Sequence, residues 1–150
     1  MVNIKEVSKK PIFLIKVVEL VLTCVCIRCV GGQYAALLRR ERPEDDDNDY
    51  KGVFPLMTAM WVQLVVYSIL LVFLLVVIIC LLTDRPMHYK IVITLAGIAT
   101  VIFAAGSAIN FEVFFMLFEA KKKTLVGAVA GLLNGAVYVT DVLLTYRDAK

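Results

Sequence analysis

Four long apolar runs dominate the chain, and short polar segments separate them. A bilayer core about 30 Å thick needs around 20 mostly apolar residues per helix, and each run reaches about that length. The runs cover residues 11–30, 57–82, 91–110 and 125–146. The pattern therefore predicts an all-α membrane protein, a four-helix transmembrane bundle that forms a single domain over residues 1–150.

The runs differ in how apolar they are. The second, from Met57 to Leu82, contains no charged residue, whereas Lys16, Glu19 and Arg28 interrupt the first. The first run also lacks the small-residue cleavage pattern of a removed signal peptide, so we expect it to be retained as a helix. An even number of spans places both termini on the same side of the membrane.

Composition supports a membrane environment. Hydrophobic residues make up 61% of the chain and the mean hydropathy is +0.84, whereas soluble domains contain about 45–50% apolar residues. The polar segments are too short to hold a soluble domain. Membrane lipids are therefore the partner that the composition requires, and we expect no nucleic-acid partner.

Charge alone does not orient the chain, because equal numbers of basic residues flank the runs on the two faces. Two features favour cytosolic termini. A lysine cluster precedes the first run, and the polar segment from Gly31 to Pro55 dilutes its basic residues with a run of acidic ones.

Charged residues inside a membrane are costly and need partners. Lys16 and Glu19 lie about one helical turn apart and can pair. Lys16 near the start of the first run and Asp141 near the end of the fourth should reach a similar depth, so we predict that they meet across the bundle. Such a cluster either joins two helices or, together with Asn134, lines an ion pathway. We favour the first, since the cluster is short and near a boundary.

Small residues form rows at a spacing of four in the last two runs. The fourth run carries Gly127, Gly131 and Gly135. The third carries a matching row of Ala96, Thr100, Ala104 and Ala108, with Gly97 and Gly106 beside it. Such rows allow close helix contact in lipid. We expect them to pack inside the bundle; the alternative is an outward face that forms a homo-oligomer.

The four cysteines lie within the first two runs, so the predicted outer loops have none for a disulfide. Cys24, Cys26 and Cys29 are too scattered around one helix to hold a metal ion, and we interpret them as small packing residues. Cys80, close to the end of the second run, is a candidate for palmitoylation.

The sequence contains no set of residues that indicates an enzyme. His88 is the single histidine and lies in a polar turn, and we find no phosphate-binding loop, Ser/His/Asp set or HExxH motif. We therefore expect a non-enzymatic protein with no metal or other cofactor.

Both ends of the chain resemble MARVEL-type four-span proteins, and among these the insect proteins of the Snakeskin type. The likeness lies in the opening PIFLIKVVELVLTCVCIRCVGG and the closing LLNGAVYVTDVLLTYR. It implies cytosolic termini and a role in membrane apposition, as a structural component of epithelial junctions such as septate junctions, with other junction or membrane proteins as partners. Vesicle trafficking is an alternative within this class, and a channel or transporter subunit is an alternative outside it. The acidic first loop matches no motif of the family, which leaves any partner of that loop undefined.

Overall fold

The computed structural model describes residues 11–40, 50–83, 85, 87–116 and 121–148. In these residues every regular element is an α-helix. The helices are α2 (Pro11–Arg40), α3 (Tyr50–Leu82), α4 (Tyr89–Met116) and α5 (Lys121–Asp148).

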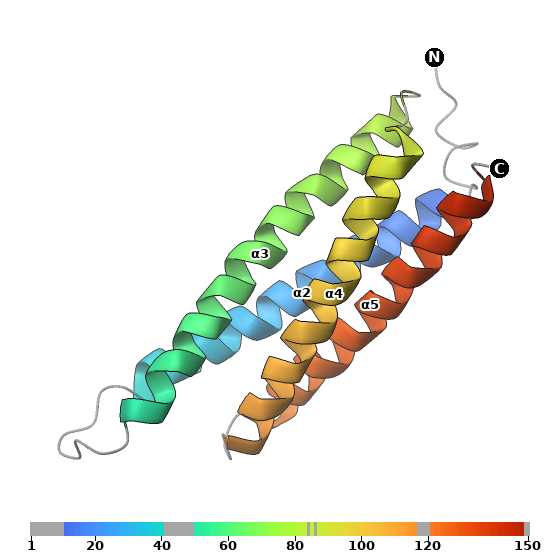
Figure 1. Ribbon diagram of the computed structural model, residues 1–150. Coiled ribbons are helices and arrows are strands. Elements are labelled where there is room, and N and C mark those ends of the chain that lie inside the picture. The colour runs from blue at the N-terminus through green and yellow to red at the C-terminus, as the bar shows by residue number, and fades with distance from the viewer. Residues whose placement is uncertain (1–10, 41–49, 84, 86, 117–120, 149–150) are drawn as a thin grey trace.

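The four helices form one elongated bundle (Figure 1). α5 packs against α4 along its length and against α2, and α2 also packs against α3. α3 and α4 follow each other directly in the chain but contact each other much less. The start of α2 and the end of α5 lie at the same end of the bundle (Figure 1). The first and last helices are therefore antiparallel neighbours.

The helices continue beyond the apolar runs. α2 extends to Arg40 instead of ending near Val30, and α3 begins at Tyr50, so the expectation of a non-helical segment from 31 to 55 is wrong for the described part of it. Residues 33–40 are mostly Gln, Ala, Leu and Arg, which favour helix even outside an apolar environment. α2 continues through Gly31, where a side chain of α3, Leu64, lies 3.6 Å from the position of the missing Cβ.

Three helices are long and apolar enough to cross a membrane. Their candidate spans are Pro55–Leu82, Tyr89–Val113 and Thr124–Arg147. Large apolar side chains are exposed around the bundle, among them Val21, Val72, Ile79, Val101, Leu133 and Leu143. Such a surface is stable when it faces lipid. The chain is therefore an integral membrane protein, and α2, with its charged residues, is not among these three spans.

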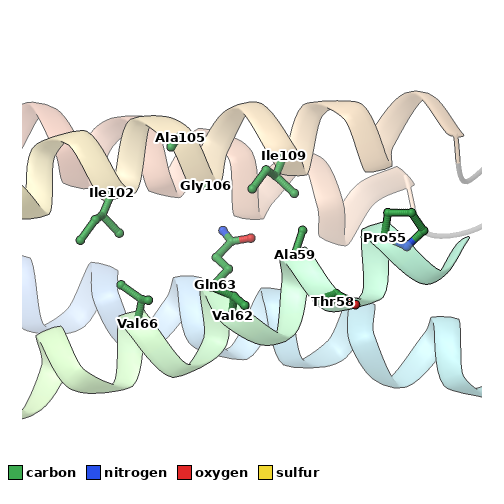
Figure 2. Close-up of a pocket in the computed structure, with 10 residues that line it drawn as sticks. All are labelled: Pro55, Thr58, Ala59, Val62, Gln63, Val66, Ile102, Ala105, Gly106 and Ile109. Carbon is green, nitrogen blue, oxygen red and sulfur yellow. The ribbon is translucent and has the colours of Figure 1, made fainter. Parts of the chain in front are cut away.

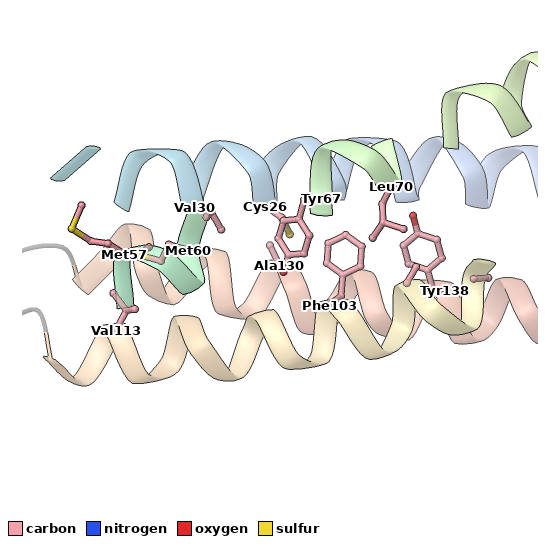
Figure 3. Packing of buried hydrophobic residues seen from close by; sticks show 12 residues of the cluster. Cys26, Val30, Met57, Met60, Tyr67, Leu70, Phe103, Val113, Ala130 and Tyr138 are labelled. Atoms are coloured by element: carbon pink, nitrogen blue, oxygen red, sulfur yellow. The ribbon is translucent and has the colours of Figure 1, made fainter. Parts of the chain in front are cut away.

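A stack of three aromatic rings crosses the centre of the bundle (Figure 3). The ring of Tyr67 on α3 lies 4.5 Å from that of Phe103 on α4, and Phe103 lies 5.6 Å from Tyr138 on α5. All three side chains are buried. The stack therefore holds three helices together at mid-length, where α3 and α4 otherwise contact each other little.

The glycine row of α5 lies inside the bundle, and Gly127, Gly131 and Gly135 are all buried. A Cβ at Gly127 would lie 3.0 Å from the Cβ of Cys29 on α2, and one at Gly131 would collide with the Ser107 hydroxyl on α4. These glycines therefore allow α5 to approach two neighbouring helices.

The row of small residues predicted on α4 does not lie along the face that packs against the neighbouring helices. Ala96 is buried, but Ala104, Ala108 and Gly97 are exposed. Steps of four residues advance by about 400° in an α-helix, so the row turns away from the neighbouring helix. The buried face instead alternates steps of three and four, and consists of Ala96, Ala99, Phe103, Gly106, Ser107, Asn110 and Val113.

Candidate functional site: a buried polar cluster between the first and last helices

Lys16, Glu19 and Asp141 meet at the contact between α2 and α5. The Nζ atom of Lys16 donates to Oδ2 of Asp141 at 2.7 Å and to Oε2 of Glu19 at 3.0 Å. The structure thus brings together all three residues that the sequence singled out. Lys16 and Glu19 are on one face of α2 because they lie three residues apart.

The cluster is closed to its surroundings. Lys16 is 3% exposed, and Glu19 and Asp141 are fully buried. The group contains two carboxyl groups and one ammonium group. The Oδ1 atom of Asp141 also accepts from the Thr145 hydroxyl at 3.5 Å, whereas Oε1 of Glu19 has no hydrogen-bond partner among the described residues.

The cluster also adjoins the aromatic stack. Lys16 Nζ lies 5.9 Å from the centre of the Tyr138 ring, a distance at which a cation is attracted to the ring face. A continuous series of contacts therefore passes from Tyr67 on α3 through Phe103 on α4 and Tyr138 on α5 to Lys16 on α2. One contact path thus links all four helices.

A second polar contact joins the same two helices. The Nδ2 atom of Asn134 donates to the hydroxyl of Thr23 at 3.0 Å, and both side chains are fully buried. Asn134 precedes Asp141 by two helical turns, about 10 Å along the axis. The Oδ1 atom of Asn134 has no partner among the described residues. The α2–α5 contact therefore has polar residues at two levels.

Sequence reasoning missed a third polar group further along the bundle. Gln33 on α2 and Asn110 on α4 are each 1% exposed, and both approach Gly127 on α5. Within the part of the chain that the structure describes, both Gln33 side-chain polar atoms and Oδ1 of Asn110 have no hydrogen-bond partner. Gln33 lies in the polar segment from 31 to 55, which the hydropathy pattern does not predict to be helical, so the sequence gives no helix face on which to place it.

An apolar groove of about 710 Å³ lies between α3 and α4, where these helices separate (Figure 2). Gln63 points into it from α3 and donates to the Tyr67 hydroxyl at 2.8 Å. A Cβ at Gly106 on α4 would collide with both of these side chains. Gly106 is therefore the position that allows α4 to pass over the Gln63–Tyr67 pair.

The cysteines and the histidine show no shared site. Cys24 is exposed, Cys26 is buried and Cys29 is intermediate, so the three point in different directions. Cys80 is partly exposed two residues before the end of α3, and its lipidation stays a prediction. His88 is exposed and stacks on Tyr89 at 4.9 Å, beside the first turn of α4.

Comparisons of this chain with protein families, with curated proteins and with solved structures find no match. Function is therefore argued from the arrangement of the residues themselves. The most distinctive arrangement is the polar cluster of Lys16, Glu19 and Asp141.

Proposed function

We propose that α2 is a fourth transmembrane span and that the protein is a four-span bundle with both termini on one side of the membrane. α2 lies antiparallel to α5, a candidate span, and pairs with it at Lys16–Asp141 and Thr23–Asn134. Its buried charged residues face the bundle. The charged residues of α2 argue against a span in lipid, but Lys16 and Glu19 face the bundle and not the lipid in this placement.

Exposed aromatic residues support the placement of α3 and α4 across the membrane, beside which α2 packs. Trp61 and Tyr89 are exposed, and aromatic residues of this kind concentrate at membrane interfaces. Trp61 and Leu82 are about 31 Å apart along α3 at 1.5 Å per residue, close to a bilayer core of about 30 Å. Arg28, exposed on α2, lies about 26 Å along the axis from Pro11. A long arginine side chain at that level reaches the lipid headgroups.

The proposed function is that of a non-enzymatic membrane organiser of the MARVEL type, most similar in role to a structural component of epithelial junctions. The observation that carries this proposal is that the buried charges pair with one another. Lys16 pairs with both carboxyl groups, one on its own helix and one across the α2–α5 contact, so the cluster joins helices. A rigid bundle with an apolar outer surface is suited to lateral association with lipids and with other membrane proteins, including copies of itself.

The experiment is to tag the protein in epithelial cells, locate it, and measure dye leakage across the cell layer after its loss. Junctional localisation with a leaking barrier supports the proposal. Vesicular staining with an intact barrier would favour the trafficking alternative. A variant with Asp141 replaced, compared with an exposed control such as Glu112→Gln, tests whether the cluster is needed for delivery to the junction.

A channel or transporter subunit is a second candidate, favoured by one observation. Polar atoms with no hydrogen-bond partner in the described ranges recur along the interior, at Glu19, Asn134, Gln63, Gln33 and Asn110. In an assembly of several copies these atoms could contact ions or water. Ion currents from the purified protein in planar bilayers that are altered by Asn134→Leu would support this candidate.

A further inference from the structure

We propose that the cluster of Lys16, Glu19 and Asp141 is a proton-binding site, in which one exchangeable proton is held on Oε1 of Glu19. The proton makes the cluster electrically neutral within the bundle. Its release would leave one negative charge at the contact between α2 and α5.

The first argument is the number of charges. Two carboxyl groups share one ammonium group, and none of the three side chains is more than 3% exposed. An uncompensated charge in a buried site is strongly unfavourable, and such groups usually neutralise instead. One additional positive charge is therefore needed, and a proton is the smallest that can supply it.

The second argument is the surroundings of the cluster. α5 contributes Asp141, the phenol of Tyr138 and the Thr145 hydroxyl, while α2 contributes Lys16, Glu19 and, one turn further, Thr23. α3 and α4 approach through a cavity of about 30 Å³ beside Lys16 and Tyr138, and their described lining residues are all apolar. They are Leu70, Phe73, Leu74, Val77, Val92, Leu95, Ala96 and Ala99. No second cation among these residues balances the cluster.

The third argument identifies the atom. Asp141 is closer to Lys16 than Glu19 is, at 2.7 Å against 3.0 Å, and accepts a further hydrogen bond from Thr145. Oε1 of Glu19 makes no hydrogen bond with the described residues, so adding a proton there breaks no existing hydrogen bond among them. A metal ion fits less well, because Lys16 already occupies the position between the two carboxyl groups and would repel it.

A small cavity beside Lys16 has space for a water molecule next to the cluster, although Glu19 itself does not line it. Its volume of about 30 Å³ exceeds the roughly 10–15 Å³ that one water molecule requires. Lys16 and Tyr138 supply polar atoms at its wall. The cluster also lies within about 12 Å of the start of α2, measured from Pro11 to Glu19 along the helix axis. Exchange would therefore occur with the side of the membrane that faces the start of α2 and the end of α5.

The test is infrared spectroscopy of the full chain in lipid vesicles, because a protonated carboxyl group has a carbonyl band that a carboxylate lacks. At neutral pH we expect one such band per chain, lost in Glu19→Gln and unchanged in Glu112→Gln, which alters an exposed carboxyl group on α4. Asp141→Asn should also remove the band, since one carboxylate and one ammonium group balance without a proton. A wild-type spectrum without the band, or a band that persists in Glu19→Gln, would overturn the proposal.

Thermal unfolding at different pH values provides a second readout. A folded state that keeps a proton which the unfolded chain releases loses stability as pH rises. The unfolding temperature of the wild type should therefore fall on alkalinisation, and Glu19→Gln should remove that part of the pH dependence. Identical pH dependence in both proteins contradicts the proposal, and so does failure of Glu19→Gln to fold, because glutamine closely resembles the protonated acid.

Discussion

Lys16 and Asp141 are 125 residues apart in sequence, and their side chains meet at 2.7 Å inside the bundle. The contact joins the first described helix to the last, so that α2 and α5 are neighbours although every other described helix lies between them in the chain. This contact couples the two ends of the chain, because removal of Lys16 would leave buried carboxyl groups without a cation on both helices.

Replacement of Asp141 by alanine should therefore destabilise the bundle strongly. Removal of one partner from a buried pair typically costs about 3–5 kcal/mol, and the remaining Lys16–Glu19 pair should hold the loss near the lower value. Thermal unfolding in detergent measures the effect, and Glu112→Ala on the exposed face of α4 is the matched control. Unchanged stability in Asp141→Ala would show that the pair does not hold the two helices together.

Replacement of all three residues of the cluster by apolar residues should not destabilise the bundle. The triple variant Lys16→Met, Glu19→Leu, Asp141→Val removes the three charges of the cluster and keeps the increase in side-chain volume small. Such replacements are often neutral or stabilising by about 1–4 kcal/mol. The triple variant should therefore unfold at or above the wild-type temperature. If it also retains junctional localisation, the cluster serves folding alone; if localisation is lost while the fold is stable, the charges have a separate role.

The sequence was sufficient to predict this pair, because charged residues in apolar runs are few and the predicted antiparallel order of the first and last runs gives Lys16 and Asp141 a similar depth. It was not sufficient to define where the helices end. α2 continues through Gln33, beyond the apolar run. Hydropathy indicates whether a residue prefers lipid or water, and does not define whether its backbone is helical. The spacing of small residues also predicts the wrong buried face for α4. Ala104 and Ala108 follow the small-residue spacing, but the position of a bulky residue, Phe103, in the aromatic stack decides which face is buried.

Gly131 and Gly97 should respond oppositely to the same substitution. A Cβ at Gly131 collides with the Ser107 hydroxyl, so Gly131→Ala should cost about 1–3 kcal/mol as an overpacked contact. A Cβ at Gly97 meets nothing within 4 Å, and Gly97→Ala should be neutral or stabilising by about 0.5–1 kcal/mol. Unfolding in detergent compares the two. Recovery of stability in Gly131→Ala with Ser107→Ala would identify the hydroxyl as the cause, whereas equal effects at both glycines would refute the close contact.

The hydrogen bond from Asn134 to Thr23 should have a small but measurable coupling energy. Double-mutant cycles in membrane bundles give about 0.6 kcal/mol on average and up to about 1.7 kcal/mol for such bonds. The cycle here combines Asn134→Leu with Thr23→Val, and unfolding in detergent gives the coupling. Thr140→Val, which alters an exposed hydroxyl on α5, is the control and should show no coupling to Asn134→Leu. Additive effects at Asn134 and Thr23 would mean that the bond contributes nothing.

The proposed fourth span can be tested by membrane topology. If α2 crosses the membrane, tags at the two termini should be reached from the same side, and a tag between residues 41 and 49 from the opposite side. If α2 lies along the surface, the N-terminal tag and the tag between 41 and 49 should be reached from one side and the C-terminal tag from the other. Labelling in sealed cells and after permeabilisation separates these outcomes. Repeating the test with Asp141→Ala asks whether insertion of α2 needs its partner, because Lys16 without Asp141 makes the least apolar helix harder to place in lipid.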